Sequence, residues 1–173
     1  MTRSEMKKGA LILLLIVVLM SCAERELISE FTGNEITYPL PAASSYPVTG
    51  SVTLKERKDG STLVRVELSG TEGTARLPVH LHMGDISVDG AEVAALLQPV
   101  DAMSGLSETN LSLLANEKLI TYKDLLTLEA NIKVHLSDTG PEKDVILAGG
   151  NIGKLFAAEI KNGRVTFGVC KSN

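Results

Sequence analysis

Aromatic residues and cysteine are scarce in this chain of 173 residues, which has no tryptophan, three tyrosines, three phenylalanines and two cysteines. The formal net charge is −4. An acidic, aromatic-poor chain lacks the basic surface that nucleic acids require, so nucleic-acid binding is excluded. No nucleophile–base pair, phosphate-binding loop or paired-carboxylate pattern stands out either. The chain contains only three histidines, and they are the one group that could carry chemistry: His80, His82 and His135.

The longest apolar run is too short to cross a bilayer comfortably. Gly9 to Met20 supplies about a dozen residues, whereas a spanning helix needs roughly 20. A short basic segment, Met1 to Lys8, precedes this run, and the combination is typical of a signal peptide. The run ends in Leu19-Met20-Ser21-Cys22, which resembles a bacterial lipobox.

The lipobox resemblance implies that residues 1–21 are removed and that Cys22 carries lipid. Burial of acyl chains, at about 0.8 kcal/mol per methylene, would then hold the protein on a membrane. We therefore predict a lipid-anchored protein of the cell envelope, on the outer membrane with a periplasmic or surface face. An uncleaved anchor helix and an ordinary signal peptide are the alternatives.

Processing at Cys22 would change both the charge and the cysteine chemistry. Removal of three basic residues and one acidic residue takes the formal net charge from −4 to −6. Acylated Cys22 leaves Cys170 without a partner, so no intramolecular disulfide is expected. We predict that Cys170 is a buried, inert thiol.

The mature chain is long enough for one domain with a substantial core. Residues 22–48 are predicted to be a tether, because three prolines, Pro39, Pro41 and Pro47, argue against a central strand there. The alternative is that Ile36 to Leu40 forms an edge strand. The domain is then predicted to occupy residues 49–173.

Alternating polar and apolar residues dominate the rest of the chain. Runs at 51–57 and 62–68 flank Asp59-Gly60 and predict a hairpin. Further strands are predicted at 75–83, 93–100, 130–136, 145–148, 156–160 and 164–169, the last two joined by an Asn162-Gly163 hairpin turn. A short helix is predicted from Thr121, with Thr121 as N-cap. The pattern indicates an all-β fold: an antiparallel Greek-key sandwich, or flattened barrel, of seven or eight strands with one short helix.

The histidines share strand faces. Side chains two residues apart on a strand point to the same side, so His80 and His82 lie together, opposite Leu77, Val79 and Leu81. His135 also lies opposite the apolar residues of its own strand. Three imidazoles suit copper or zinc and leave an open coordination position. The alternative is that all three are ordinary polar residues on a sheet face.

Several short motifs resemble those of copper/zinc superoxide dismutases and of chordin-type (CHRD) domains in bacterial lipoproteins. The dismutase-like motifs are Gly50-Ser51-Val52-Thr53-Leu54, Val64 to Gly70 and His80-Leu81-His82-Met83-Gly84-Asp85. The CHRD-like motifs are Gln98 to Asp101, Ser107 to Asn110, the helix from Thr121 to Leu128, Asn131 to His135, and Ala148 to Gly153 as a closing turn. The resemblance covers residues 48–168.

The resemblance implies that His80, His82 and His135 occupy copper-ligand positions. The dismutase zinc ligands, bridging histidine and disulfide have no counterpart, because no further histidine or cysteine pair exists. Met83 could add a soft ligand, although an ideal strand points it away from His82. Asp85 and Glu67 are candidates for orienting the rings. We predict an envelope lipoprotein acting as a non-catalytic binding or structural module for an envelope protein or small ligand, with a copper-binding protein or remnant dismutase as the alternative.

Overall fold

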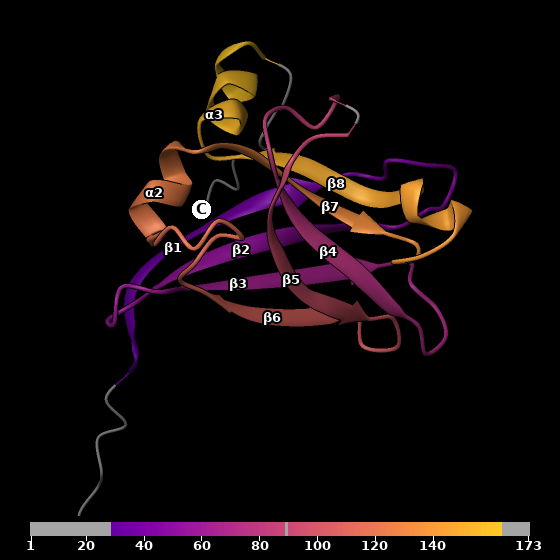
Figure 1. Cartoon of the computed structure of the whole chain (residues 1–173), viewed down its shortest axis with the longest axis horizontal. Coiled ribbons are helices and arrows are strands. Elements are labelled where there is room, and N and C mark those ends of the chain that lie inside the picture. Colours follow the sequence, from indigo (N-terminus) through magenta and orange to yellow (C-terminus); the bar gives the residue numbers. More distant parts are fainter. Residues whose placement is uncertain (1–28, 89, 164–173) are drawn as a thin grey trace, which may run out of the picture.

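The computed structural model describes residues 29–88 and 90–163, which form an antiparallel sheet of eight strands (Figure 1). The strand order is β1-β2-β3-β6-β5-β4-β7-β8. The strands are β1 (Phe31–Leu40), β2 (Thr49–Arg57), β3 (Thr62–Ser69), β4 (Arg76–Met83), β5 (Val93–Asp101), β6 (Leu106–Leu111), β7 (Glu129–His135) and β8 (Ile146–Ile152). The predicted all-β antiparallel fold is confirmed.

The sheet has Greek-key connections and curls into a nearly closed, flattened barrel. β4, β5 and β6 follow one another as neighbours, and β7 returns to pair with β4. The first and last strands then approach each other, and Ala42 forms an antiparallel bridge with Ala148. Gly150 makes this approach possible, because a Cβ at that position would lie only 2.4 Å from the backbone oxygen of Pro39.

Among the described residues, two α-helices and one 3-10 helix accompany the barrel: α2 (Tyr122–Thr127), η1 (Pro141–Asp144) and α3 (Gly153–Lys161). α2 and α3 lie at the left and top of Figure 1, away from η1 at the right. The predicted N-cap of α2 is confirmed, since Thr121 and Asp124 form a reciprocal capping box. In the described part of the chain, the helices are all too short or too polar to cross a membrane.

β1 corrects the predicted tether at residues 31–40 and confirms the alternative that Ile36 to Leu40 forms an edge strand. Phe31–Leu40 pairs with β2, and Tyr38 and Leu40 are fully buried in the core. The prolines argued only against a central strand, and β1 is the first strand in the sheet order, where a missing backbone donor is tolerated. The carbonyl of Pro41 still accepts a hydrogen bond from the backbone N–H of Gly149 (3.1 Å). The domain therefore begins well before residue 49.

α3 corrects the predicted strand at 156–160 and its Asn162-Gly163 hairpin. A strand would bury every second residue, but Gly153 and Phe156 are the buried residues of this segment. That spacing suits a helix with one inward face, and Phe156 packs edge-on against Tyr38 with ring centroids 5.0 Å apart. Gly153 begins α3 inside the predicted closing turn. The predicted strand at 164–169, and Cys22 and Cys170, lie outside the described residues.

Candidate functional site

The three histidines lie on two neighbouring strands, on the outer face of the barrel. β4 and β7 are paired so that His80 is opposite Lys133 and His82 is opposite Asn131. His135 lies at the end of β7, diagonal to His80. The inward residues of β4 are buried as predicted, with Leu77, Val79 and Leu81 at most 4% exposed. The register therefore brings His135 to the same side of the same sheet as the His-x-His pair.

The rings form a compact triangle. The ring centroids of His80 and His135 are 4.7 Å apart, those of His80 and His82 5.7 Å, and those of His82 and His135 6.0 Å. One ring nitrogen from each residue lies within 4.8 Å of the other two. Three nitrogens bound tetrahedrally to a zinc at 2.0–2.1 Å would be about 3.4 Å apart, so binding needs the nitrogens to approach one another by up to about 1.4 Å.

Backbone carbonyls orient two of the rings. The Nδ1–H of His82 donates to the oxygen of Ala91 (2.9 Å), and the Nδ1–H of His135 donates to the oxygen of Lys143 (2.7 Å). A carbonyl can only accept, so each neutral ring carries its proton on Nδ1 and its lone pair on Nε2. Both Nε2 atoms are buried, and neither has a hydrogen-bond partner among residues 29–88 and 90–163. This is the tautomer and the carbonyl partner that metal-binding histidines use.

His80 is the third and least constrained ligand candidate. Among residues 29–88 and 90–163, no hydrogen bond to its ring is observed, and the ring is partly exposed. It can therefore supply the inward movement that the other two rings, held by Ala91 and Lys143, resist.

The electrostatic environment keeps the imidazoles neutral. Burial, with smaller contributions from the neighbouring His135 and His82, lowers the pKa of His80 to about 4. Burial is also the main cause that lowers the pKa of His82 and of His135, and the charge of Lys133 adds to both effects. Neutral imidazole is the form that binds metals, so the site is ready to coordinate at neutral pH.

These lowered pKa values predict that the metal-free protein loses stability in mild acid. Unfolded histidines, with a pKa near 6.5, take up protons as the pH falls, while the folded His80 stays neutral until about pH 4. The contribution of His80 to the free energy of unfolding therefore keeps its full value above pH 6.5 and decreases as the pH falls from 6.5 to 4. We expect His80 to contribute about 1–2 kcal/mol, after discounting the shift for the partial exposure of the ring.

Urea unfolding with a chelator at pH 4.5 and 7.0 measures this loss. The pH dependence of the free energy of unfolding is compared between the wild type and His80→Asn. Titration of the carboxylates contributes equally to both proteins, so the difference reports the titration of the His80 ring. Equal pH dependence in both proteins would contradict the prediction.

Polar residues beside the histidines are buried because the connection from β4 to β5 covers them. Lys133 is 4% exposed and its Nζ donates to the oxygen of Val88 (3.2 Å). Asn131 is fully buried and donates to the oxygen of Gly84 (2.8 Å). Alternation alone could have placed Lys133 and Asn131 on the face of His135. Their burial could not be read from the sequence, because it depends on where the connection folds.

Neither the possible soft ligand Met83 nor the candidate orienting residue Glu67 joins the cluster. Met83 packs against the hydrophobic core, on the opposite face from His82, as an ideal strand predicts. Glu67 lies on β3 and pairs with Arg65 at 2.9 Å. The rings of His82 and His135 are oriented by backbone carbonyls rather than by carboxylates.

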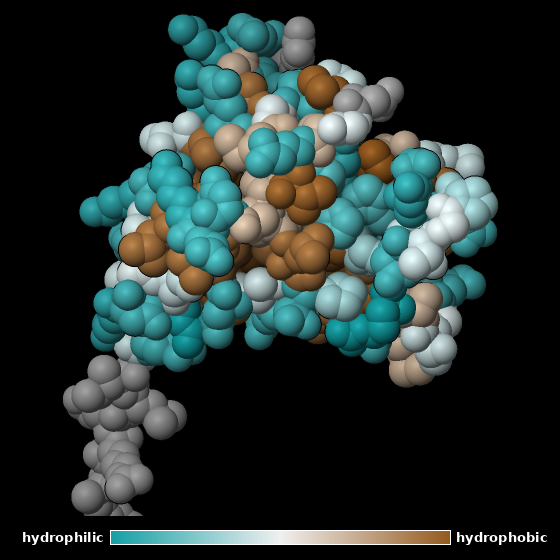
Figure 2. Space-filling view, viewed as in Figure 1, coloured by the Kyte–Doolittle hydropathy of each residue, from teal (hydrophilic) through white to brown (hydrophobic). Residues whose placement is uncertain are grey.

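A pocket of about 390 Å³ opens beside the cluster. Its lining includes His82, His135, Lys133 and Asp144. On the neighbouring strand, Leu96 is 72% exposed and lies opposite His80 in the ladder. Figure 2 shows hydrophobic surface near the middle of this view, over β4 and β5. The cluster therefore has room for a fourth ligand on one side and an apolar surface on the other.

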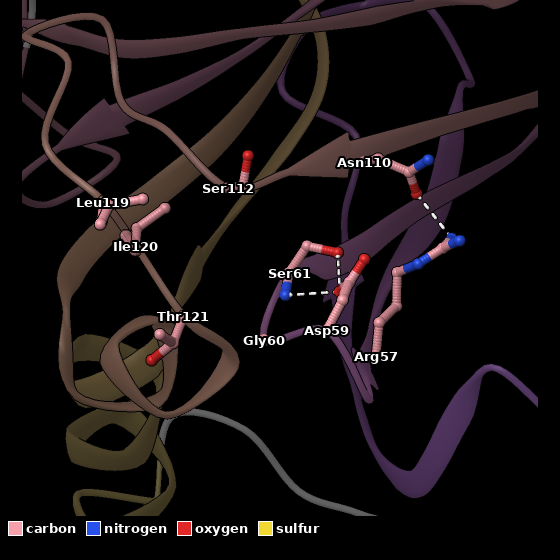
Figure 3. A pocket seen from close by; sticks show the side chains of 9 residues that line it. All are labelled: Arg57, Asp59, Gly60, Ser61, Asn110, Ser112, Leu119, Ile120 and Thr121. Atoms are coloured by element: carbon pink, nitrogen blue, oxygen red, sulfur yellow. Dashed lines mark hydrogen bonds between the residues drawn. The ribbon is translucent and has the colours of Figure 1, made fainter.

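A larger pocket lies elsewhere and is a weaker candidate site. It has a volume of about 490 Å³ and is lined by Arg57, Asp59, Gly60, Ser61, Asn110, Ser112, Leu119, Ile120 and Thr121 (Figure 3). Its charged side chains are already engaged, since Arg57 donates to Asn110 (2.8 Å) and Ser61 donates to Asp59. None of these nine residues carries a buried polar atom without a partner. The pocket with the greater volume therefore lacks free polar groups for a ligand, and the histidine cluster is the better candidate site.

The three-histidine cluster is the one group of metal-ligand side chains that the described residues bring together. The sequence placed all three on strand faces, and the structure adds their convergence, their tautomers and their burial. No protein-family model and no curated protein matches this chain.

Proposed function

We propose that this domain binds one copper or zinc ion through His80, His82 and His135. The observation that carries the proposal is a pair of buried Nε2 atoms without a partner in the described part of the chain, on rings whose Nδ1–H groups are held by carbonyls. An unpartnered buried polar atom costs roughly 1–3 kcal/mol, and coordination would remove that cost at two positions at once.

The set of three histidine ligands favours an open metal site over a closed structural one. Imidazole suits copper and zinc, and three protein ligands with an open position characterise carrier or catalytic sites. The resemblance to the copper strand of dismutases supports copper. Dismutase turnover is not part of the proposal, because the chain has no histidine left for a second metal.

The proposed location is the cell envelope. The lipobox-like Leu19-Met20-Ser21-Cys22 supports lipid attachment at Cys22. The domain would then be a membrane-anchored metal-binding module. The bound metal would be exchanged with a small ligand or another envelope protein through the open pocket.

Metal content tests the proposal. The protein starting at residue 29, loaded with copper or zinc and desalted, is expected to retain about one ion per chain by elemental analysis. The variant His80→Asn/His82→Asn/His135→Asn is expected to retain none, while Lys154→Gln, a substitution on α3, serves as the matched control. Equal metal content in the wild type and the triple variant would refute the site.

A further inference from the structure

Lys133 places a buried positive charge beside the three histidines. It is 4% exposed and lies directly opposite His80 in the ladder between β4 and β7. Opposite side chains of an antiparallel pair have Cβ atoms about 4.5–5.5 Å apart. The ammonium group is held there by the carbonyl of Val88, and it lines the same pocket as His82 and His135.

The charge of Lys133 is poorly compensated. Among the described residues, the ion pairs join other groups, and none of them includes Lys133. Asp144 lines the pocket as well, but it is exposed to solvent. Its effect on the pKa of His135 ranks below that of Lys133 and has the opposite sign. A buried charge is screened less than an exposed one, so the charge of Lys133 outweighs that of Asp144 at His82 and His135.

The ligands themselves provide no negative charge. The cluster consists of three neutral imidazoles, without a carboxylate or thiolate among the described residues. A doubly charged ion therefore meets the full repulsion of the ammonium group. Coulomb repulsion is proportional to the charge of the ion, so a singly charged ion meets half of it.

We propose that Lys133 makes this three-histidine site selective for Cu(I) over Zn(II). The inference rests on the metal site proposed above and adds the identity and oxidation state of the ion. Three nitrogen ligands can surround Cu(I) without an additional anion, and imidazole is a suitable ligand for copper. Lys133 acts through its charge on the ion and not as a ligand.

Competition titrations with chromophoric chelators test the selectivity at pH 7, with Cu(I) measured under anaerobic, reducing conditions. The wild type is expected to bind Cu(I) more tightly than Zn(II). In Lys133→Gln, which keeps an amide donor for Val88, the affinity for Zn(II) should rise about tenfold and that for Cu(I) about threefold. Lys133→Arg keeps the charge and should retain the wild-type ratio, and so should Lys154→Gln, which changes an exposed lysine on α3.

The outcomes separate this inference from the proposed function. Absence of any bound metal in the wild type refutes the site and the inference together. Binding of both ions with the same ratio in the wild type and Lys133→Gln refutes the inference and leaves the site intact. A wild type that prefers Zn(II) also refutes it, and this measurement does not depend on whether any variant folds.

Discussion

Replacing His82 with asparagine should lower the affinity for the bound metal by at least about a thousandfold, or about 4 kcal/mol. Asparagine is too short to reach the position of the imidazole Nε2, so the site loses one of three ligands. Loss of a group that merely orients a ligand already costs about 10–100-fold in affinity. Loss of the ligand itself should cost more, and competition with a chromophoric chelator measures the difference.

The same loss is expected for His80→Asn and His135→Asn. Gln98→Ala, a substitution at an exposed position of β5, should bind like the wild type. Thermal unfolding of each metal-free variant separates lost coordination from lost folding, because His82 is buried and its substitution also affects packing. An unchanged affinity in one single variant would reduce the site to two nitrogens, and unchanged affinity in all three would place the metal elsewhere.

Much of the fold could be predicted because local patterns and tertiary structure agree. The hairpin of β2 and β3 combines alternation with an Asp59-Gly60 turn, and its strands pair antiparallel as predicted. The N-cap at Thr121 was readable for the same reason, since the capping box is formed by residues three apart. Where one segment contains both the alternating or helical pattern and the turn or cap residues that end it, its structure depends little on distant contacts.

The wrong predictions lie where contacts between residues distant in sequence determine the secondary structure. Phe156 reads as part of an apolar run, and its burial against Tyr38 of β1 selects a helix instead of a strand. β1 itself has few apolar positions and contains Pro39, but β2 pairs along most of its length. Neither interaction involves residues that are close in sequence, so local propensity could not decide them, and the strand from Ile36 to Leu40 stood only as an alternative.

The site shows the same division. Alternation predicted which faces His80, His82 and His135 occupy. Their convergence required the pairing of β4 with β7, which a sequence pattern does not specify. The register also shifts next to His82, against β5, and next to His135, against β8. Such bulges re-aim side chains and carry no clear sequence signal, so the geometry of the cluster could not be predicted.

Shortening the chain should distinguish a tether from a strand at the N-terminal side of the domain. A protein that begins at residue 29 retains β1 and is expected to unfold in one cooperative transition. A protein that begins at residue 49 loses Tyr38 and Leu40, which are 1% and 0% exposed. Burial of two large apolar side chains contributes about 3–6 kcal/mol, comparable to the whole stability of many domains, about 5–15 kcal/mol.

The shorter protein also exposes an unpaired edge of β2, which favours aggregation. We therefore expect it to lack a cooperative thermal transition by circular dichroism and to elute as aggregates in size-exclusion chromatography. Tyr38→Ala in the longer protein is the graded comparison, with an expected loss of about 3–5 kcal/mol, because it removes one core contact of β1 and keeps the strand. A protein beginning at residue 49 that melts within a few degrees of the longer one would show that β1 is dispensable and that the barrel closes without it.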